Sequence, residues 1–185
     1  MKKNLFAVVL VGIAGVGVMA VQEPPEMPKP VKEHAWLKQL AGEWDAESEV
    51  TMGPGAPPMK LKGTESGRML GDIWLVSEIK GDSPMGIPMS AVLTIGYDPE
   101  KKKFVGTWID SFLPFMWRYE GTLDEAGKKL TLNTEGPNMM VPGKTAQYRE
   151  TIEIVDKDHK TFSSSMKGDD GNWTTFVTGK YTRKK

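Results

Sequence analysis

The sequence predicts an all-β protein, an antiparallel up-and-down β-barrel of about ten strands preceded by one short helix. Stretches with the two-residue alternation of strands recur about ten times from Trp44 to Arg183, at the spacing of hairpins. Glycine, proline, asparagine and aspartate gather at the breaks, as tight turns require. No helical stretch between them is long enough for the crossover of a parallel pair. A closed barrel removes exposed sheet edges, and a two-sheet sandwich is the structural alternative.

Length and composition indicate one ordinary globular domain. The 185 residues suffice for a single sizeable core but not comfortably for two. The formal net charge is +0, so no field of either sign would recruit nucleic acid, which we do not expect as a partner. Cysteine is absent from the sequence, which excludes disulfides and thiol chemistry and leaves stability to the core alone.

Residues 1–20 have the pattern of a secretory signal peptide. Lys2 and Lys3 precede an apolar stretch over residues 5–18, and Val18-Met19-Ala20 fits cleavage after Ala20. An uncleaved membrane anchor is the alternative, although the stretch is short for a span and contains three glycines. We therefore expect an exported protein, periplasmic or secreted, without a membrane span after cleavage. Residues 21–30 form a proline-rich linker, and residues 31–185 form the single domain.

The first strand is entered through a helix and a glycine. Residues 31–41 predict a short amphipathic helix that covers one barrel end with Trp36, Leu37 and Leu40. Gly42 would end this helix in a conformation that other residues avoid. Trp44 then follows at the mouth of the first strand, where we expect it in the core, closing that end with its indole N–H on one acceptor.

The expected strands are bounded by turn residues that can be seen directly in the sequence. They cover residues 44–52, 59–70, 73–80, 89–97, 103–111, 115–123, 129–135, 145–155, 160–167 and 173–183.

Alternation along these strands predicts which side chains face the interior. The inward faces are apolar with polar insertions, notably Ser48, Asp110, Glu150 and Thr175. A solid core rarely takes so many polar groups, since each needs a partner, whereas a partly wet cavity takes them readily. A filled barrel in which these groups satisfy one another is the alternative. On the last strand the predicted inward set is Trp173, Thr175, Val177, Gly179 and Tyr181.

Several stretches are similar to one protein family. The run over residues 95–111, IGYDPEKKKFVGTWIDS, resembles the signature of bacterial domain of unknown function 1579. Residues 40–44, 148–150 and 181–184 are similar to that family as well, and the resemblance covers most of residues 37–185. It implies a lipocalin-like or fatty-acid-binding-protein-like antiparallel barrel. It implies no particular activity, because the family has no established one.

Catalytic motifs are missing from the sequence. It contains no nucleophile elbow, phosphate-binding glycine loop or metal-spaced cluster of histidine and cysteine. Its two histidines are His34 in the leader helix and His159 in a turn. Asp110 and Glu150 would make an acid/base pair for a hydrolase or isomerase if both faced one cavity. The plainer interpretation pairs an interior carboxylate with an arginine such as Arg149, Arg118 or Arg68. We assign no catalytic residue, and whether the protein is an enzyme stays open.

The sequence gives little indication of a bound metal or cofactor. Haem held by a histidine near the C-terminus, as in nitrobindin-type barrels, is not expected, since residues 173–183 contain no histidine. Loop methionines offer soft thioethers for Cu(I), but no Met-x-x-Met run and no histidine accompany them. A pliable apolar rim around a pocket mouth is the commoner meaning, and ordinary core filling is the third. We expect no metal site and no cofactor.

These observations favour an exported barrel that binds a small, largely apolar molecule inside, without chemistry. Among the aromatic residues, Trp108, Trp117 and Tyr119 are expected to line the pocket, and Gly121 beside them to leave room for a ligand. A structural or interaction module of the cell envelope with a filled barrel is the alternative. The ligand's identity and the oligomeric state do not follow from the sequence. The predicted ligand-binding residues are Trp108, Asp110, Trp117, Tyr119, Glu150, Met116, Met85 and Met89.

Overall fold

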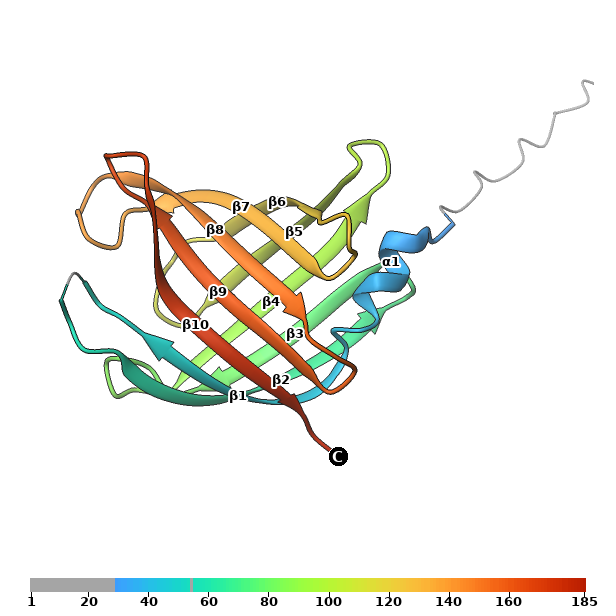
Figure 1. Cartoon of the computed structure of the whole chain (residues 1–185), viewed down its shortest axis with the longest axis horizontal. Helices are drawn as coiled ribbons and strands as arrows, with labels where there is room; N and C mark the ends of the chain where they lie inside the picture. The colour runs from blue at the N-terminus through green and yellow to red at the C-terminus, as the bar shows by residue number, and fades with distance from the viewer. Residues whose placement is uncertain (1–28, 54) are drawn as a thin grey trace, which may run out of the picture.

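The structure is a computed structural model that describes residues 29–53 and 55–185. The described strands form a closed antiparallel barrel of ten strands, in which each strand pairs with its sequence neighbours and β1 pairs with β10 (Figure 1). This confirms the predicted fold class, and the strand bounds differ from the expected ones by two residues at most. The elements are α1 (Lys32–Leu37), β1 (Gly42–Val50), β2 (Met59–Leu70), β3 (Trp74–Gly81), β4 (Met89–Asp98), β5 (Lys103–Asp110), β6 (Trp117–Leu123), β7 (Lys129–Pro137), β8 (Thr145–Ile154), β9 (His159–Lys167) and β10 (Trp173–Arg183).

The N-terminal predictions fall mostly outside this range. The expected signal peptide, residues 1–20, and most of the linker, residues 21–30, lie outside the described residues. Within the described part of the chain, no helix has the length and apolar character needed to cross a membrane.

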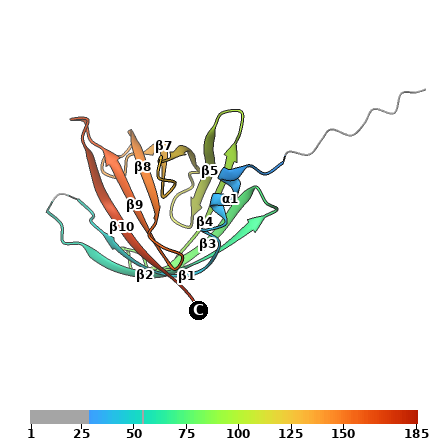
Figure 2. The same cartoon turned by 45° about the vertical axis from the view of Figure 1, so that its right-hand side comes forward.

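The two ends of the barrel differ. Figures 1 and 2 both show α1 at one end, and the tips of the β1–β2 and β9–β10 hairpins at the opposite end. Trp36, Leu37 and Leu40 are buried at the α1 end, where the Trp36 Nε1–H donates a hydrogen bond to the Gly127 carbonyl at 2.8 Å. We call this the covered end and the opposite one the open end.

The helix is shorter than the predicted span of residues 31–41. It ends at Leu37, and the chain continues in a tighter turn, in which Gln39 N–H donates to Trp36 and Leu40 N–H to Leu37. Gly42 opens β1 with a φ of +120°, in the region that only glycine occupies without strain. The tighter turn therefore brings the chain into the barrel wall at this residue.

Trp44 closes the covered end, as predicted. Its side chain is completely buried, and Nε1–H donates to the Leu40 carbonyl at 3.0 Å. The Arg183 guanidinium lies 4.0 Å from the centre of the indole ring. Arg183 also donates to the carbonyls of Ala41 (2.7 Å) and Gln39 (3.0 Å), so the last strand is tied to the segment before the first.

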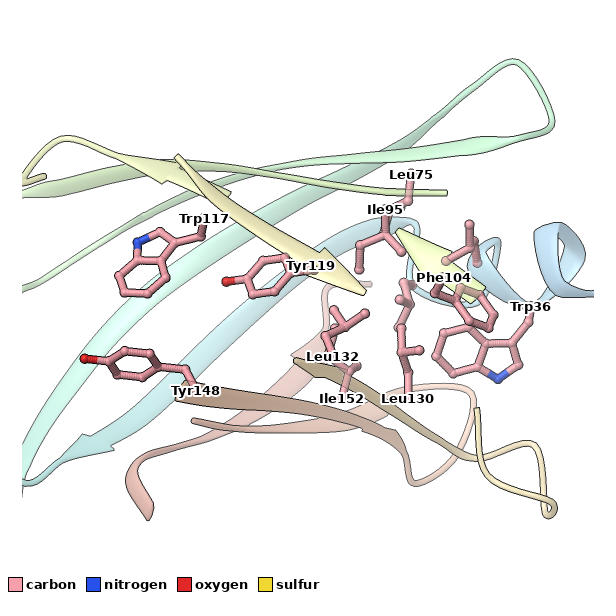
Figure 3. Close-up of a cluster of buried hydrophobic side chains, with 12 residues drawn as sticks. Trp36, Leu75, Ile95, Phe104, Trp117, Tyr119, Leu130, Leu132, Tyr148 and Ile152 are labelled. Carbon is pink, nitrogen blue, oxygen red and sulfur yellow. The ribbon is translucent and has the colours of Figure 1, made fainter. Parts of the chain in front are cut away.

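The apolar core lies directly beneath α1. Leu75, Ile95, Phe104, Leu130 and Leu132 are each at most 1% exposed and come from β3, β4, β5 and β7. In Figure 3 they lie between Trp36 on one side and Trp117 and Tyr148 on the other. The half of the barrel near α1 is therefore filled.

Candidate ligand-binding site

Beyond the core, toward the open end, the interior is lined by aromatic rings. Trp117 and Tyr148 are buried with ring centres 5.0 Å apart, and Phe115 and Phe176 extend the edge-to-face contacts on either side. Figure 3 shows the Tyr119 hydroxyl pointing away from the aliphatic core, toward Trp117 and Tyr148. Trp117 and Tyr119, two of the predicted site residues, therefore lie together on the inner wall.

A glycine makes room for this aromatic layer. A Cβ at Gly136 would strike the Trp117 ring and would lie 2.8 Å from the Phe115 ring. Sequence reasoning missed this residue, since nothing in the run of residues 129–137 marks the glycine as a packing partner of a tryptophan on another strand.

The predicted role of Gly121 is wrong. A Cβ there would strike the Thr131 carbonyl oxygen and would lie 2.8 Å from the Leu132 Cα on β7. The missing side chain permits a close approach of two strands and leaves no space for a ligand.

The last strand also departs from the predicted alternation. Thr175 pairs with Ser165 and Val177 with Ser164, so Phe176 is the extra residue of a β-bulge. The bulge reverses the alternation, and Trp173 lies on the outer face, 4.0 Å from the Arg149 guanidinium. The expected inward orientation of Trp173 and Thr175 is therefore wrong.

Trp108 and Asp110 interact with each other on β5. Trp108 Nε1–H donates to Asp110 Oδ2 at 2.9 Å, and Asp110 Oδ1 accepts from the backbone N–H groups of Phe112 (2.8 Å) and Leu113 (3.0 Å). Oδ2 is thus engaged by Trp108 on β5, and Oδ1 holds the start of the β5–β6 loop. This arrangement leaves Asp110 little capacity for acid/base chemistry.

Glu150 is the carboxyl group among three described residues whose buried side-chain oxygens lack a hydrogen-bond partner, the other two being Ser77 and Thr134. Its Oε1 accepts from the Ser164 hydroxyl at 2.9 Å, while its buried Oε2 accepts no hydrogen bond from any described residue. The buried Thr134 hydroxyl, on the neighbouring strand β7, has no partner among the described residues either. Burial raises the pKa of Glu150 to about 7, and the Ser164 hydrogen bond only partly opposes this.

Three tyrosines lie within the electrostatic reach of Glu150. Burial raises the pKa of Tyr119 strongly, and the charges of Glu150 and Asp110 raise it further. Burial and Glu150 likewise raise the pKa of Tyr148, whose hydroxyl donates to the Pro137 carbonyl at 2.7 Å. The pKa of Tyr181 is raised by burial, then by Glu65 and Glu150. The charges of Glu150 and Asp110, the two predicted carboxylates, thus both raise the pKa of Tyr119.

The expected pairing of an interior carboxylate with arginine is wrong, and the buried ion pair lies elsewhere. Lys160 Nζ is 2.8 Å from Glu65 Oε2, and both side chains are less than a tenth exposed. The ammonium also lies 4.5 Å from the Trp44 ring centre and 5.0 Å from that of Tyr181. Burial lowers the pKa of Lys160 against the opposing effect of Glu65. The lysine at an inward position of its strand was the signal that sequence reasoning overlooked.

The interior is not completely filled. Several apolar side chains that face inward are only half-buried, which indicates space that solvent reaches. These side chains are Leu93, Trp108, Phe162, Met166 and Phe176. A separate hollow of about 260 Å³ lies on the outer face of β3, β4 and β5, where exposed side chains such as Glu78, Lys80 and Ile109 line it.

The methionines of the predicted mouth lie at the open end. Met85 and Met116 are 62% and 50% exposed, and Met89 is half-buried at the start of β4. Met52, Met139 and Met140 are also exposed, on the hairpins β1–β2 and β7–β8. Each of these loops lies at the end of the barrel away from α1 (Figure 1).

The histidines lie away from this interior. His34 is buried on α1, with Nε2 3.1 Å from the Tyr97 carbonyl, and His159 lies exposed beside Asp156. Within residues 29–53 and 55–185, no group of three or more His, Cys, Asp or Glu side chains is arranged to hold a metal ion.

Comparison with known proteins gives a family and a fold. A family model described as "Protein of unknown function (DUF1579)" matches residues 29–183. The crystal structure of Rv2717c from M. tuberculosis superposes with a TM-score of 0.59 at 14% identity, covering 81% of this chain and 98% of that one. The S-type phycobiliprotein lyase CPES from Guillardia theta gives a TM-score of 0.54 at 17% identity, covering 85% of this chain and 99% of that one. No curated protein matches the sequence.

Proposed function

The chain belongs to the DUF1579 family, and from its interior we propose that it binds a small, largely apolar molecule inside the barrel without transforming it. The observation that carries the proposal is the buried Glu150 Oε2, which accepts no hydrogen bond from the described residues and lies in a half of the barrel lined by aromatic rings. A buried acceptor without a partner costs about 1–3 kcal/mol, and a bound molecule that donates to it removes this cost. Apolar walls with a few convergent polar groups are the usual composition of a ligand pocket.

A likeness in fold agrees with the proposal. The solved barrels of similar fold include a protein named as a phycobiliprotein lyase, which indicates that such a barrel can act on a partner molecule. At 17% identity this likeness concerns the fold, and the binding proposal rests on the interior of this chain.

We also propose where binding takes place. The signal peptide expected from residues 1–20 would deliver the domain outside the cytoplasm, with the mature chain beginning after Ala20. The intact mass of the protein from a periplasmic or culture-medium fraction tests this directly. A cytoplasmic protein that retains residues 1–20 would contradict it.

Native mass spectrometry of the protein purified from its own host tests the binding proposal. We expect a reproducible additional mass that disappears on denaturation. Trp108→Ala, which removes a half-buried ring from the inner wall, should lower the loaded fraction, whereas the matched control Trp173→Ala on the outer face should not. A bare chain that also gains no mass from a lipid extract of the host would contradict the proposal and favour a filled barrel acting through its outer surface.

A further inference from the structure

The charged groups around Glu150 determine which polar end a ligand must have. Glu150 projects from β8 into the interior, where Ser164 on β9 holds one of its oxygens at 2.9 Å. The other oxygen is buried and unpartnered among the described residues. An ionised carboxylate accepts hydrogen bonds only, so the complementary ligand atom must be a donor.

Carboxylates predominate around this point. The charges of Glu150, Asp110 on β5 and Glu65 on β2 raise the pKa values of the interior tyrosines Tyr119 and Tyr181, and burial raises them most. The interior cation on β9, Lys160, is already paired with Glu65 at 2.8 Å.

The nearby arginines do not balance these carboxylates. The Arg149 guanidinium lies outside the wall on Trp173, and Arg183 is bound to carbonyl groups at the covered end. Within the part of the chain that the structure describes, a ligand carboxylate would therefore meet carboxylates and no unpaired interior cation, an arrangement that costs free energy at short range.

The surroundings of Glu150 also orient a ligand. On the covered side the interior is packed with Leu130, Leu132 and Ile152, which leaves no room for an apolar chain. On the other side lie Trp117 and Tyr148 (Figure 3). The exposed methionines lie beyond them, at the open end. A ligand with its polar end at Glu150 must therefore extend its apolar body toward the open end.

We propose that the ligand is an amphipathic cation whose ammonium group binds Glu150 Oε2 and whose apolar part lies among the aromatic rings toward the open end. This inference rests on the proposed function and names the ligand class for the same site. It distinguishes the site from one built for fatty acids or other anionic amphiphiles, which need a free cation inside.

The titration of Glu150 predicts how the affinity for an ammonium ligand depends on pH. Its pKa is about 7, whereas an alkylammonium, like the lysine side chain, keeps its proton to about pH 10. The carboxylate fraction rises about tenfold between pH 6 and pH 8, so the affinity for an ammonium should rise by about the same factor. The tyrosines facing Glu150, which are Tyr119, Tyr148 and Tyr181, have raised pKa values and stay neutral over this range.

Three probes of equal chain length test the inference: decylammonium, decanoate and decanol, each below its micelle concentration. Titrated into the full chain and followed by calorimetry, decylammonium should bind about tenfold more tightly at pH 8 than at pH 6, and at least tenfold more tightly than decanoate at pH 8. Glu150→Gln, which keeps an acceptor for Ser164, should bind decylammonium no better than decanol. The matched control Glu153→Gln, on the same strand but exposed and paired with Lys129, should behave like the wild type.

Each contrary result overturns the inference, and the wild-type comparisons need no variant to fold. Tighter binding of decanoate, equal binding of decanol and decylammonium without a pH dependence, or no binding of any probe would each contradict an ammonium site. If native mass spectrometry still shows a carried molecule, the proposed function stands and only the ligand class is wrong.

Discussion

Replacing Lys160 by methionine should destabilise the barrel strongly, because it leaves the Glu65 carboxylate buried without its cation. The two groups are 2.8 Å apart and each side chain is at most 7% exposed. Removing one partner of such a pair costs about 3–5 kcal/mol. In a domain of this size about 1 kcal/mol corresponds to 2–4 °C, so the melting temperature should fall by about 6–20 °C. Tryptophan fluorescence during thermal and urea unfolding measures both quantities.

Two further variants separate the charge effect from lost packing. The double variant Glu65→Gln with Lys160→Met has no stranded charge and should recover about 1–3 kcal/mol relative to Lys160→Met alone. Lys129→Met breaks the exposed pair with Glu153, which spans 3.1 Å, and should cost less than about 1 kcal/mol. If Lys160→Met costs no more than Lys129→Met, or if the double variant is simply the sum of the single ones, the reasoning about a stranded interior charge is refuted.

Three other outcomes follow from single positions. Gly42→Ala should lower the free energy of unfolding in urea by about 1–3 kcal/mol, because φ is +120° and the added Cβ would strike Arg183. The control Gly71→Ala should lower it by less, because φ is +61° there and the Cβ would meet open space. Gly136→Ala should displace Trp117, change the near-ultraviolet circular dichroism spectrum and lower the free energy of unfolding by about 1–3 kcal/mol. An unchanged spectrum would contradict the packing of Gly136 against Trp117. Glu150 binds its proton more tightly in the folded state, where its pKa is about 7, than in the unfolded state, where it is 4.5. The contribution of this group to the free energy of unfolding should therefore be largest below pH 4.5 and fall by about 3 kcal/mol up to pH 8. If Glu150→Gln loses stability over this pH range as steeply as the wild type, the reasoning is contradicted.

The fold was largely predictable because its signals are local. Turn residues mark each strand end, and alternation marks each inward face, so the bounds of β2 and β10 were predicted to the residue. The same reasoning gave wrong predictions at two places, the last strand near Phe176 and the glycine at position 121. The bulge at Phe176 depends on pairing with β9, and the close approach at Gly121 depends on the β7 backbone. Neither partner is visible from the strand itself.

The candidate site was predictable only in part. Alternation placed Trp117, Tyr119 and Glu150 on inward faces, where the structure has them. It did not reveal that Asp110 is occupied by the β5–β6 loop, or that the interior cation, Lys160, pairs with Glu65 across 95 residues of sequence. The contacts of Asp110 are local to the turn after β5, whereas the Lys160–Glu65 pair arises from barrel closure, so only a three-dimensional structure identifies that pair.

The contact between Arg183 and the Ala41 carbonyl joins residues 142 positions apart, and it bears on truncated chains. Bringing such distant segments together costs about 4 kcal/mol of chain entropy, which the pairing of β1 with β10 and the Arg183 hydrogen bonds offset. Without β10, β1 and β9 each present an unpaired edge, and no barrel exists. We therefore expect a chain truncated before Trp173 to remain an open sheet prone to association.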